Sequence, residues 1–234
     1  MEILRSFVLG LVDAVAPPLC VLCGGLPDAF PWLCESCARD LRLYTGGVCL
    51  RCGAPRAIDA PLCGGCPDWP KRLSAARSAG VHAGTLRHLT HALKYGRQLA
   101  VAQPLGHVVA ASARQMPIAA GTVVVPVPLH RSRRRQRGFN QATEIARVAA
   151  RALGLPMRPR WLRRVRDEMP SVIRSAAGRQ RAVRGAFRAH EAVRGRPILL
   201  VDDVLTTGAT LGACARALGR RGAGEIRAVT ASRA

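Results

Sequence analysis

Eight of the chain's nine cysteines form four Cys-x-x-Cys pairs near the N-terminus. Ten residues separate the two pairs in each half of this segment, and a shift of 29 residues superimposes one half on the other. The segment is therefore an internal duplication. Two thiolates separated by two residues can ligate one metal ion from a tight turn, and two such turns complete a tetrahedral site. The candidate ligands are Cys20, Cys23, Cys34, Cys37, Cys49, Cys52, Cys63 and Cys66.

Zinc is the metal that closed four-thiolate sites favour, and its role in them is structural. Four disulfides in a secreted domain would explain the even number of cysteines but not one repeated spacing. Iron–sulfur clusters use other spacings. The pattern leaves open whether both halves bind zinc, and whether each ion takes its ligands from one repeat or from interleaved turns.

A second group of chemically useful residues lies in the segment I-L-L-V-D-D-V-L-T-T-G-A-T at 198–210. Its apolar run predicts a buried strand that ends in two carboxylates, at the edge where open α/β sheets bind ligands. Asp202 and Asp203 can hold vicinal hydroxyls, directly or through Mg²⁺. An ordinary strand–turn–helix needs only one capping Asp. The following residues offer N–H groups and hydroxyls for a phosphate: Thr206, Thr207, Gly208, Ala209 and Thr210.

A basic segment follows another apolar run, at 122–127. We expect a second strand there, which delivers a loop of cations to the same edge of the sheet. Arginine suits bidentate contacts with phosphate. The alternatives are a solvated basic loop or a patch that binds nucleic acid. The residues of this candidate anion loop are Arg131, Arg133, Arg134, Arg135, Arg137 and Gly138.

Strands and helices alternate in the second part of the chain. This alternation predicts an α/β fold: a parallel sheet with helices on both faces. The division expected is an N-terminal helix at 1–17, a double zinc ribbon at 18–68 and the α/β domain at 74–234. The expected strands are 77–82, 122–127, 196–201 and 226–231, and the expected helices are 84–95, 99–115, 140–153 and 209–220.

The composition favours an anionic partner. Lys and Arg number 36 against 14 acidic residues, a formal net charge of +22. Such a charge attracts phosphorylated small molecules, nucleic acid or acidic membrane. No apolar run near the N-terminus is long enough to span a bilayer. Ala14-Val15-Ala16 resembles a signal cleavage site, but Glu2 and Asp13 flank a very short apolar stretch. We therefore expect an amphipathic helix and a cytoplasmic protein.

These motifs together resemble known families. The segment 198–210 resembles the signature of type I phosphoribosyltransferases that binds 5-phosphoribosyl-1-diphosphate (PRPP). The resemblance implies that Asp202 and Asp203 bind the ribose hydroxyls in catalysis with Mg²⁺ nearby, that residues 206–210 bind the 5′-phosphate, and that the basic loop receives pyrophosphate. P-V-P at 126–128, R-G-F-N-Q-A at 137–142, L-K-Y-G at 93–96 and the double zinc ribbon resemble the ComF family.

Three functions follow from this resemblance. The first is transfer of a phosphoribosyl group from PRPP to a nitrogen base, as in nucleotide salvage. The second is a PRPP sensor without catalysis, because Arg166–Val172 departs from the T-P-x-Q-like mobile loop usual in the family. The third is binding of single-stranded DNA, since ComF members are associated with DNA uptake in natural transformation. With aromatic residues at 4%, such binding would rely on phosphates. Cys214, His88 and His91 are interpreted as packing or surface residues.

Overall fold

The computed structural model describes residues 19–26, 32–66, 69–166, 183 and 185–234. The predicted N-terminal helix and most of the divergent loop at 166–172 lie outside these residues. The sheet strands are β1 (Ala75–Val81), β2 (Val123–Pro126), β5 (Ile198–Leu205) and β6 (Ile226–Arg233). The helices are α2 (Glu35–Arg39), α3 (Gly84–Lys94), α4 (Ala102–Arg114), α5 (Arg131–Arg137), α6 (Gln141–Leu153) and α8 (Ala209–Arg220), and the 3-10 turns are Leu99–Val101, Pro159–Trp161 and Glu191–Val193.

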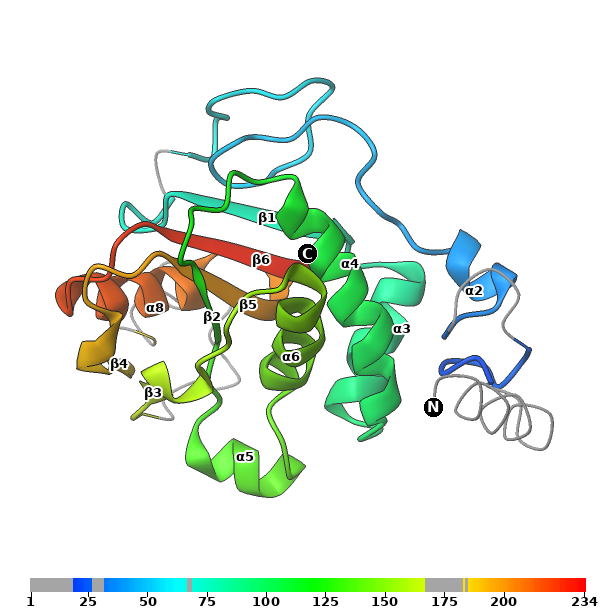
Figure 1. The fold of residues 1–234 in the computed structure, drawn as a ribbon. Helices are drawn as coiled ribbons and strands as arrows, with labels where there is room; N and C mark the ends of the chain where they lie inside the picture. The colour runs from blue at the N-terminus through cyan, green and yellow to red at the C-terminus, as the bar shows by residue number, and fades with distance from the viewer. Residues whose placement is uncertain (1–18, 27–31, 67–68, 167–182, 184) are drawn as a thin grey trace, which may run out of the picture.

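The four main strands form one parallel sheet in the order β1-β6-β5-β2 (Figure 1). Side chains of alternate strand residues enter two separate cores, as a two-layered α/β sheet requires. Val123, Ile198 and Leu200 face the core that contains α8. Val124 and Leu199 face the core that contains α3, α4 and α6. The predicted α/β class with helices on both faces is confirmed.

β5 runs further than the sequence predicts. Its pairing with β6 continues past the acidic pair to Leu205 and Arg233. Asp202 and Asp203 therefore lie inside the paired strand, and the loop starts only at Thr206. The reason is that Val204 and Leu205 extend the apolar pattern beyond the two acids, and Leu205 is buried. The backbone that carries the two carboxylates is thus held by its pairing with β6.

The basic segment is a helix rather than the expected loop. α5 covers all the arginines of the candidate anion loop. His130 precedes the helix, and its side chain accepts a hydrogen bond from the Ser132 N–H group. Gly138 ends the helix at a φ of 84°, a left-handed conformation that glycine adopts without strain. Arginine is a good helix former, so this cationic run becomes a short, ordered element at the edge of the sheet.

A second, two-stranded sheet was not predicted. β3 (Leu162–Arg164) pairs in antiparallel orientation with β4 (Phe187–Ala189). Leu162 and Phe187 are fully buried, which fixes this small sheet against α8 and the same core. Three residues of alternating burial are too short a pattern to separate a strand from a loop in the sequence. The small sheet brackets the segment that the sequence analysis identifies as divergent.

The two cysteine repeats pack against opposite faces of the main sheet. Cys20, Leu33 and Cys34 join the core of α3 and α4, and the Trp32 ring stacks on His107 of α4 at 4.4 Å. Cys49 and Cys52 instead join the core of α8. The segment between the repeats lies along the β1 edge, where Leu43 pairs with Gly80. Each face of the main sheet is therefore covered in part by one cysteine repeat.

Candidate functional site

The predicted binding residues gather at the carboxyl edge of the sheet. β2 and β5 are adjacent and parallel, so the segments that follow them leave the sheet at the same edge. α5 follows β2, and the Thr206–Thr210 loop follows β5. α3, which follows β1, reaches this edge as well, because Lys94 at its end contacts Asp203. Acids, arginines and the proposed phosphate loop therefore share one end of the molecule.

Asp202 and Asp203 form a tight pair. The Asp203 N–H group donates a hydrogen bond of 3.0 Å to Asp202 Oδ1. Burial, together with the neighbouring charge of Asp203, raises the pKa of Asp202 to about 8. Asp202 is therefore protonated near neutral pH, and a cation that binds there would favour its ionised form.

Lys94 is a site residue that sequence reasoning did not assign. Its ammonium group lies 2.9 Å from Asp203 Oδ2, and the two side chains are 22% and 13% exposed. The sequence analysis used Lys94 only as part of the L-K-Y-G resemblance. α3 and the acidic pair are more than a hundred residues apart in the chain, and no local pattern indicates that they meet. Lys94 supplies the positive charge that the two carboxylates need.

His82 completes this end of the sheet. Its Nδ1 is hydrogen-bonded to Ser232 Oγ at 2.8 Å, across the neighbouring ends of β1 and β6. Burial, followed by the charges of Lys94 and His91, lowers the pKa of His82. The His82 ring is therefore neutral near pH 7, and Lys94 is the cation of this pair. The His91 ring lies 6.2 Å from it and 5.4 Å from Tyr95.

α5 is attached to the end of α3. Arg97 donates a hydrogen bond of 2.8 Å to the Gln136 carbonyl oxygen. The Arg137 guanidinium lies over the Tyr95 ring at 5.6 Å from its centroid, within cation–π range. Tyr95 directly follows Lys94, so these contacts join the arginine helix to the segment that begins at the lysine partner of Asp203. The whole K-Y-G-R segment thus joins two parts of the candidate site.

The loop after β5 combines exposure with one fixed turn. Thr206 and Thr207 are exposed, whereas Gly208 is buried. Gly208 caps α8 in a left-handed conformation with φ of 74°, which glycine adopts without strain. Its carbonyl accepts the Gly212 N–H at 2.8 Å, the first bond of the helix. The loop therefore leads directly into the N-terminus of α8, where backbone N–H groups favour a phosphate.

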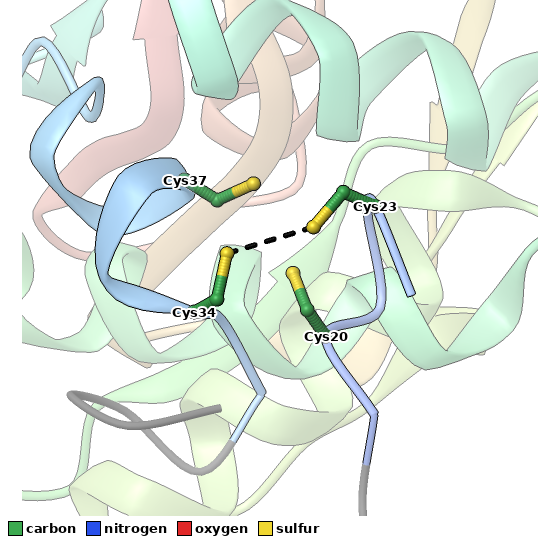
Figure 2. A group of neighbouring side chains, drawn as sticks. All are labelled: Cys20, Cys23, Cys34 and Cys37. Atoms are coloured by element: carbon green, nitrogen blue, oxygen red, sulfur yellow. Dashed lines mark hydrogen bonds between the residues drawn. The ribbon is translucent and has the colours of Figure 1, made fainter. Parts of the chain in front are cut away.

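The cysteines form two separate clusters, each built from one repeat. In the described residues, the four Sγ atoms of each repeat lie within 4.8 Å of one another. Figure 2 shows the first cluster, in which the four thiols of Cys20, Cys23, Cys34 and Cys37 point toward a common centre. The interleaved arrangement that the spacing had left open is thereby excluded. The second cluster consists of Cys49, Cys52, Cys63 and Cys66.

The geometry of both clusters fits zinc. Sγ atoms are 3.5 Å apart for Cys23–Cys34 and 3.4 Å for Cys52–Cys63. A tetrahedron with Zn–S bonds of about 2.3 Å has edges of roughly 3.8 Å, whereas a disulfide needs about 2.05 Å. Every one of these cysteines is a free thiol. The first Cys-x-x-Cys turn has the same backbone hydrogen bond in both repeats: the Gly24 and Gly53 N–H groups donate to the carbonyl oxygens of Cys20 and Cys49.

Cys214 is a packing residue in the structure, and His88 and His91 lie at the surface. Cys214 is fully buried on α8, and burial raises its pKa well above the ordinary thiol value. His88 is exposed, and neither it nor His91 belongs to a metal-type cluster among the residues that the structure describes. Within the same part of the chain, no helix is both long and apolar enough to cross a bilayer.

Comparison with known proteins identifies the same two parts. Residues 113–233 match the phosphoribosyl transferase domain family, and residues 11–67 match the double zinc ribbon domain family. The DNA utilization protein YhgH of Salmonella typhimurium is 33% identical over 216 residues, covering 90% of this chain and 94% of that protein. The chain belongs to the ComF family.

Two further ComF relatives carry competence names. Competence protein F of Haemophilus influenzae is 27% identical over 219 residues, which cover 88% of this chain and 93% of the relative. Competence protein ComFC of Bacillus subtilis is 27% identical over 198 residues, with 81% and 79% covered. The double zinc ribbon agrees with the two thiol clusters, and the phosphoribosyl transferase domain agrees with the parallel sheet and its loops. Structural zinc and a phosphoribosyltransferase-type α/β fold are therefore the framework of this ComF chain.

Proposed function

We propose that the chain binds PRPP at the carboxyl edge of β2 and β5. The observation that carries this proposal is the convergence of an acid pair, its lysine partner, the arginine helix α5 and the Thr206–Thr210 loop at one edge of the sheet. PRPP has a ribose with vicinal hydroxyls, a 5′-phosphate and a pyrophosphate. Each of these groups has a matching set of side chains or N–H groups.

The roles divide by charge. Asp202 and Asp203 receive the ribose hydroxyls, and their carboxylate oxygens are the hard ligands that Mg²⁺ prefers. The exposed loop of Thr206 and Thr207 binds the 5′-phosphate at the start of α8. Lys94 and the arginines of α5 face the pyrophosphate. Because Lys94 already neutralises Asp203, the acid pair does not repel an incoming anion as strongly as two free carboxylates would.

In the enzymatic form of this proposal, a nitrogen base attacks C1 of the ribose while the bond from C1 to the pyrophosphate oxygen breaks. Positive charge develops on the ribose, where the acid pair stabilises it. Negative charge develops on the departing pyrophosphate, beside Lys94 and α5. Mg²⁺, when bound, supplies further charge neutralisation at the leaving group.

Calorimetry with intact, zinc-loaded protein tests this proposal. PRPP with Mg²⁺ should bind more tightly than ribose 5-phosphate, because it adds the pyrophosphate. The double variant Asp202→Asn, Asp203→Asn should lose at least about tenfold in affinity. Absence of PRPP binding to the wild-type protein would refute the proposal. Pyrophosphate release with a panel of nitrogen bases then separates an enzyme from a sensor, which binds PRPP but releases none.

A second candidate function, single-stranded DNA binding, also has a specific observation in its favour. Arg131, Arg134 and Arg135 are exposed on one short helix, in a chain of net charge +22. Relatives carry names that refer to DNA utilization and competence. A cationic helix binds phosphates without reading sequence. We propose that such binding uses the same helix as the pyrophosphate, so that DNA and PRPP weaken each other's affinity.

A further inference from the structure

Trp69 lies between the second zinc ribbon and the proposed phosphate loop. Its backbone N–H group donates a hydrogen bond of 3.0 Å to the carbonyl oxygen of Cys66, the last cysteine of that ribbon. Its side chain is buried, with an exposed fraction of 6%. A Cβ atom placed on Gly208 would lie 2.9 Å from Trp69 Cζ3. The indole ring is therefore in contact with the one buried residue of the loop.

The residues after Trp69 continue along α8. A Cβ on Gly212 would lie 2.5 Å from Pro70 Cγ, and a Cβ on Gly219 would lie 3.3 Å from Arg72 Cδ. Gly208, Gly212 and Gly219 are spaced by four and seven residues, so they share one face of the helix. The linker lies directly on this glycine face, and at Gly212 a larger side chain would collide with Pro70.

The second ribbon is also anchored to the sheet on which the loop depends. Arg233, at the end of β6, donates a hydrogen bond of 2.7 Å to the Cys52 carbonyl. The Ala76 N–H group of β1 donates to the Arg51 carbonyl at 2.9 Å. Cys49 and Cys52 share a core with Trp69 and α8. The first ribbon belongs to the other core, with α3 and α4.

A phosphate loop binds tightly only if its N–H groups are already held in the bound geometry. A flat, buried ring beside Gly208 restricts the turn that leads into α8. The ring is itself held through the backbone bond to Cys66, whose position depends on the zinc turn. We propose that Trp69 is a positioning residue through which the zinc-bound second ribbon holds the 5′-phosphate loop; this inference rests on the proposed PRPP function.

Two small probes isolate the effect. Ribose 5-phosphate reports on the phosphate loop, whereas inorganic pyrophosphate with Mg²⁺ reports on Lys94 and α5. Trp69→Leu keeps an apolar side chain but removes the ring. It should lower the affinity for ribose 5-phosphate by about tenfold and change that for pyrophosphate by less than about twofold. Trp69→Phe, which keeps a ring against Gly208, should restore most of the ribose 5-phosphate affinity.

The two ribbons offer a matched pair of variants. Cys34 and Cys63 occupy equivalent positions in the duplication, because their numbers differ by the repeat length of 29. Cys63→Ser, which removes a ligand of the second cluster, should reproduce the selective loss of ribose 5-phosphate binding. Cys34→Ser, in the first cluster, should leave the ratio of the two affinities at its wild-type value. Zinc content and circular dichroism are measured on every variant.

The outcomes separate the inference from the proposed function. Selective loss in Trp69→Leu and Cys63→Ser, with recovery in Trp69→Phe, supports the positioning role. An equal loss of both probes, or a ratio unchanged from wild type, overturns it, because a purely structural tryptophan would act on both probes alike. If the wild-type protein binds pyrophosphate and PRPP but not ribose 5-phosphate, the inference fails while PRPP binding stands. If wild type binds neither PRPP nor ribose 5-phosphate, the proposed function fails and takes the inference with it.

Discussion

Asp202 and Asp203 place two acids on neighbouring residues of a buried strand, where charge is costly. Asp203 is stabilised by Lys94 at 2.9 Å. Asp202 has the Asp203 N–H group as its hydrogen-bond donor, and its pKa is raised to about 8. The fold therefore carries an acid that prefers to be protonated until a cation arrives. A buried acid pair of this kind costs stability, which agrees with the binding role proposed above.

The first prediction concerns Asp202→Asn. The folded-state pKa of about 8 lies above the ordinary value of 3.8, so the stability of the wild type falls as pH rises between these values. Asparagine cannot ionise and removes this dependence. Between pH 6.5 and 9, without Mg²⁺, the variant should gain about 2 kcal/mol in unfolding free energy relative to wild type. Urea denaturation at both pH values measures the difference.

The control for this experiment is Glu191→Gln, which neutralises an exposed carboxylate. Its unfolding free energy should follow that of the wild type at both pH values. If Asp202→Asn does the same, Asp202 is ionised in the folded protein at neutral pH, and the account of its burial given above is wrong.

Lys94 gives the second prediction. Lys94→Met keeps the length of the side chain but removes the charge beside Asp203 and the proposed pyrophosphate site. PRPP–Mg²⁺ affinity should fall by about tenfold, the effect of losing one well-placed charge in a partly buried site. The matched control is Lys71→Met, because Lys71 is the chain's other lysine and is exposed. Equal affinities for the two variants in calorimetry would remove Lys94 from the binding site.

At the scale of elements, the zinc ribbons act as parts of the core. Each ribbon contributes buried cysteines to a different side of the main sheet. A metal ion that holds these cysteines would therefore stabilise the core of the α/β domain as well as the ribbon itself. The short helix α5 is the contrasting case, since none of its residues is buried. Its position depends instead on contacts with Tyr95 and Arg97 of the segment after α3.

The third prediction follows from the two clusters. Metal analysis should find two Zn²⁺ per chain, and a strong chelator should lower the melting temperature of the α/β domain as well as unfold the ribbons. Structural zinc contributes on the order of 10 kcal/mol in small modules. Cys214→Ser should keep both ions, since Cys214 lies outside the clusters. Eight disulfide-bonded cysteines in mass spectrometry, without zinc, would contradict this prediction.

At the scale of the whole molecule, charge is distributed over both ends of the sheet. The carboxyl edge carries α5. The opposite end carries Arg188, Arg220 and Arg221, which line a cavity of about 250 Å³ beside the small sheet. A general excess of positive charge would attract DNA to either end. A specific anion site would concentrate binding on α5.

The fourth prediction distinguishes these cases. Replacing Arg133, Arg134 and Arg135 with Ala preserves helix propensity and should flatten the salt dependence of single-stranded DNA binding. Each lost phosphate contact reduces the log–log slope by roughly 0.7. The matched control is the triple Ala variant of Arg188, Arg220 and Arg221, which removes the same charge from the opposite end. If both variants change the slope equally, the binding reflects net charge alone.

The sequence determined the strands of the main sheet, its long helices and the chemistry of the residues at their ends. The duplicated cysteine spacing predicted two zinc-type repeats, and the apolar run before two acids predicted a buried strand with a ligand site at its end. Hydrophobic periodicity and residue spacing are local properties of the sequence, so they can be recognised without knowledge of the fold. The helix at 209–220 was predicted with the bounds that the structure has. The helical state of 131–137 was not predicted, because five arginines in seven residues carry no apolar periodicity.

Only the tertiary structure decided which of these ends meet. Lys94 and Asp203 are separated by more than a hundred residues, and an isolated lysine in a helix gives no sign of its partner. The contact of Trp69 with Gly208 likewise required the ribbon, the linker and α8 to pack together. The tertiary structure also decided that each thiol cluster comes from one repeat. The sequence states which side chains are present. Which distant charges and rings come into contact depends on the strand order of the sheet and on how the helices and the ribbon pack against it.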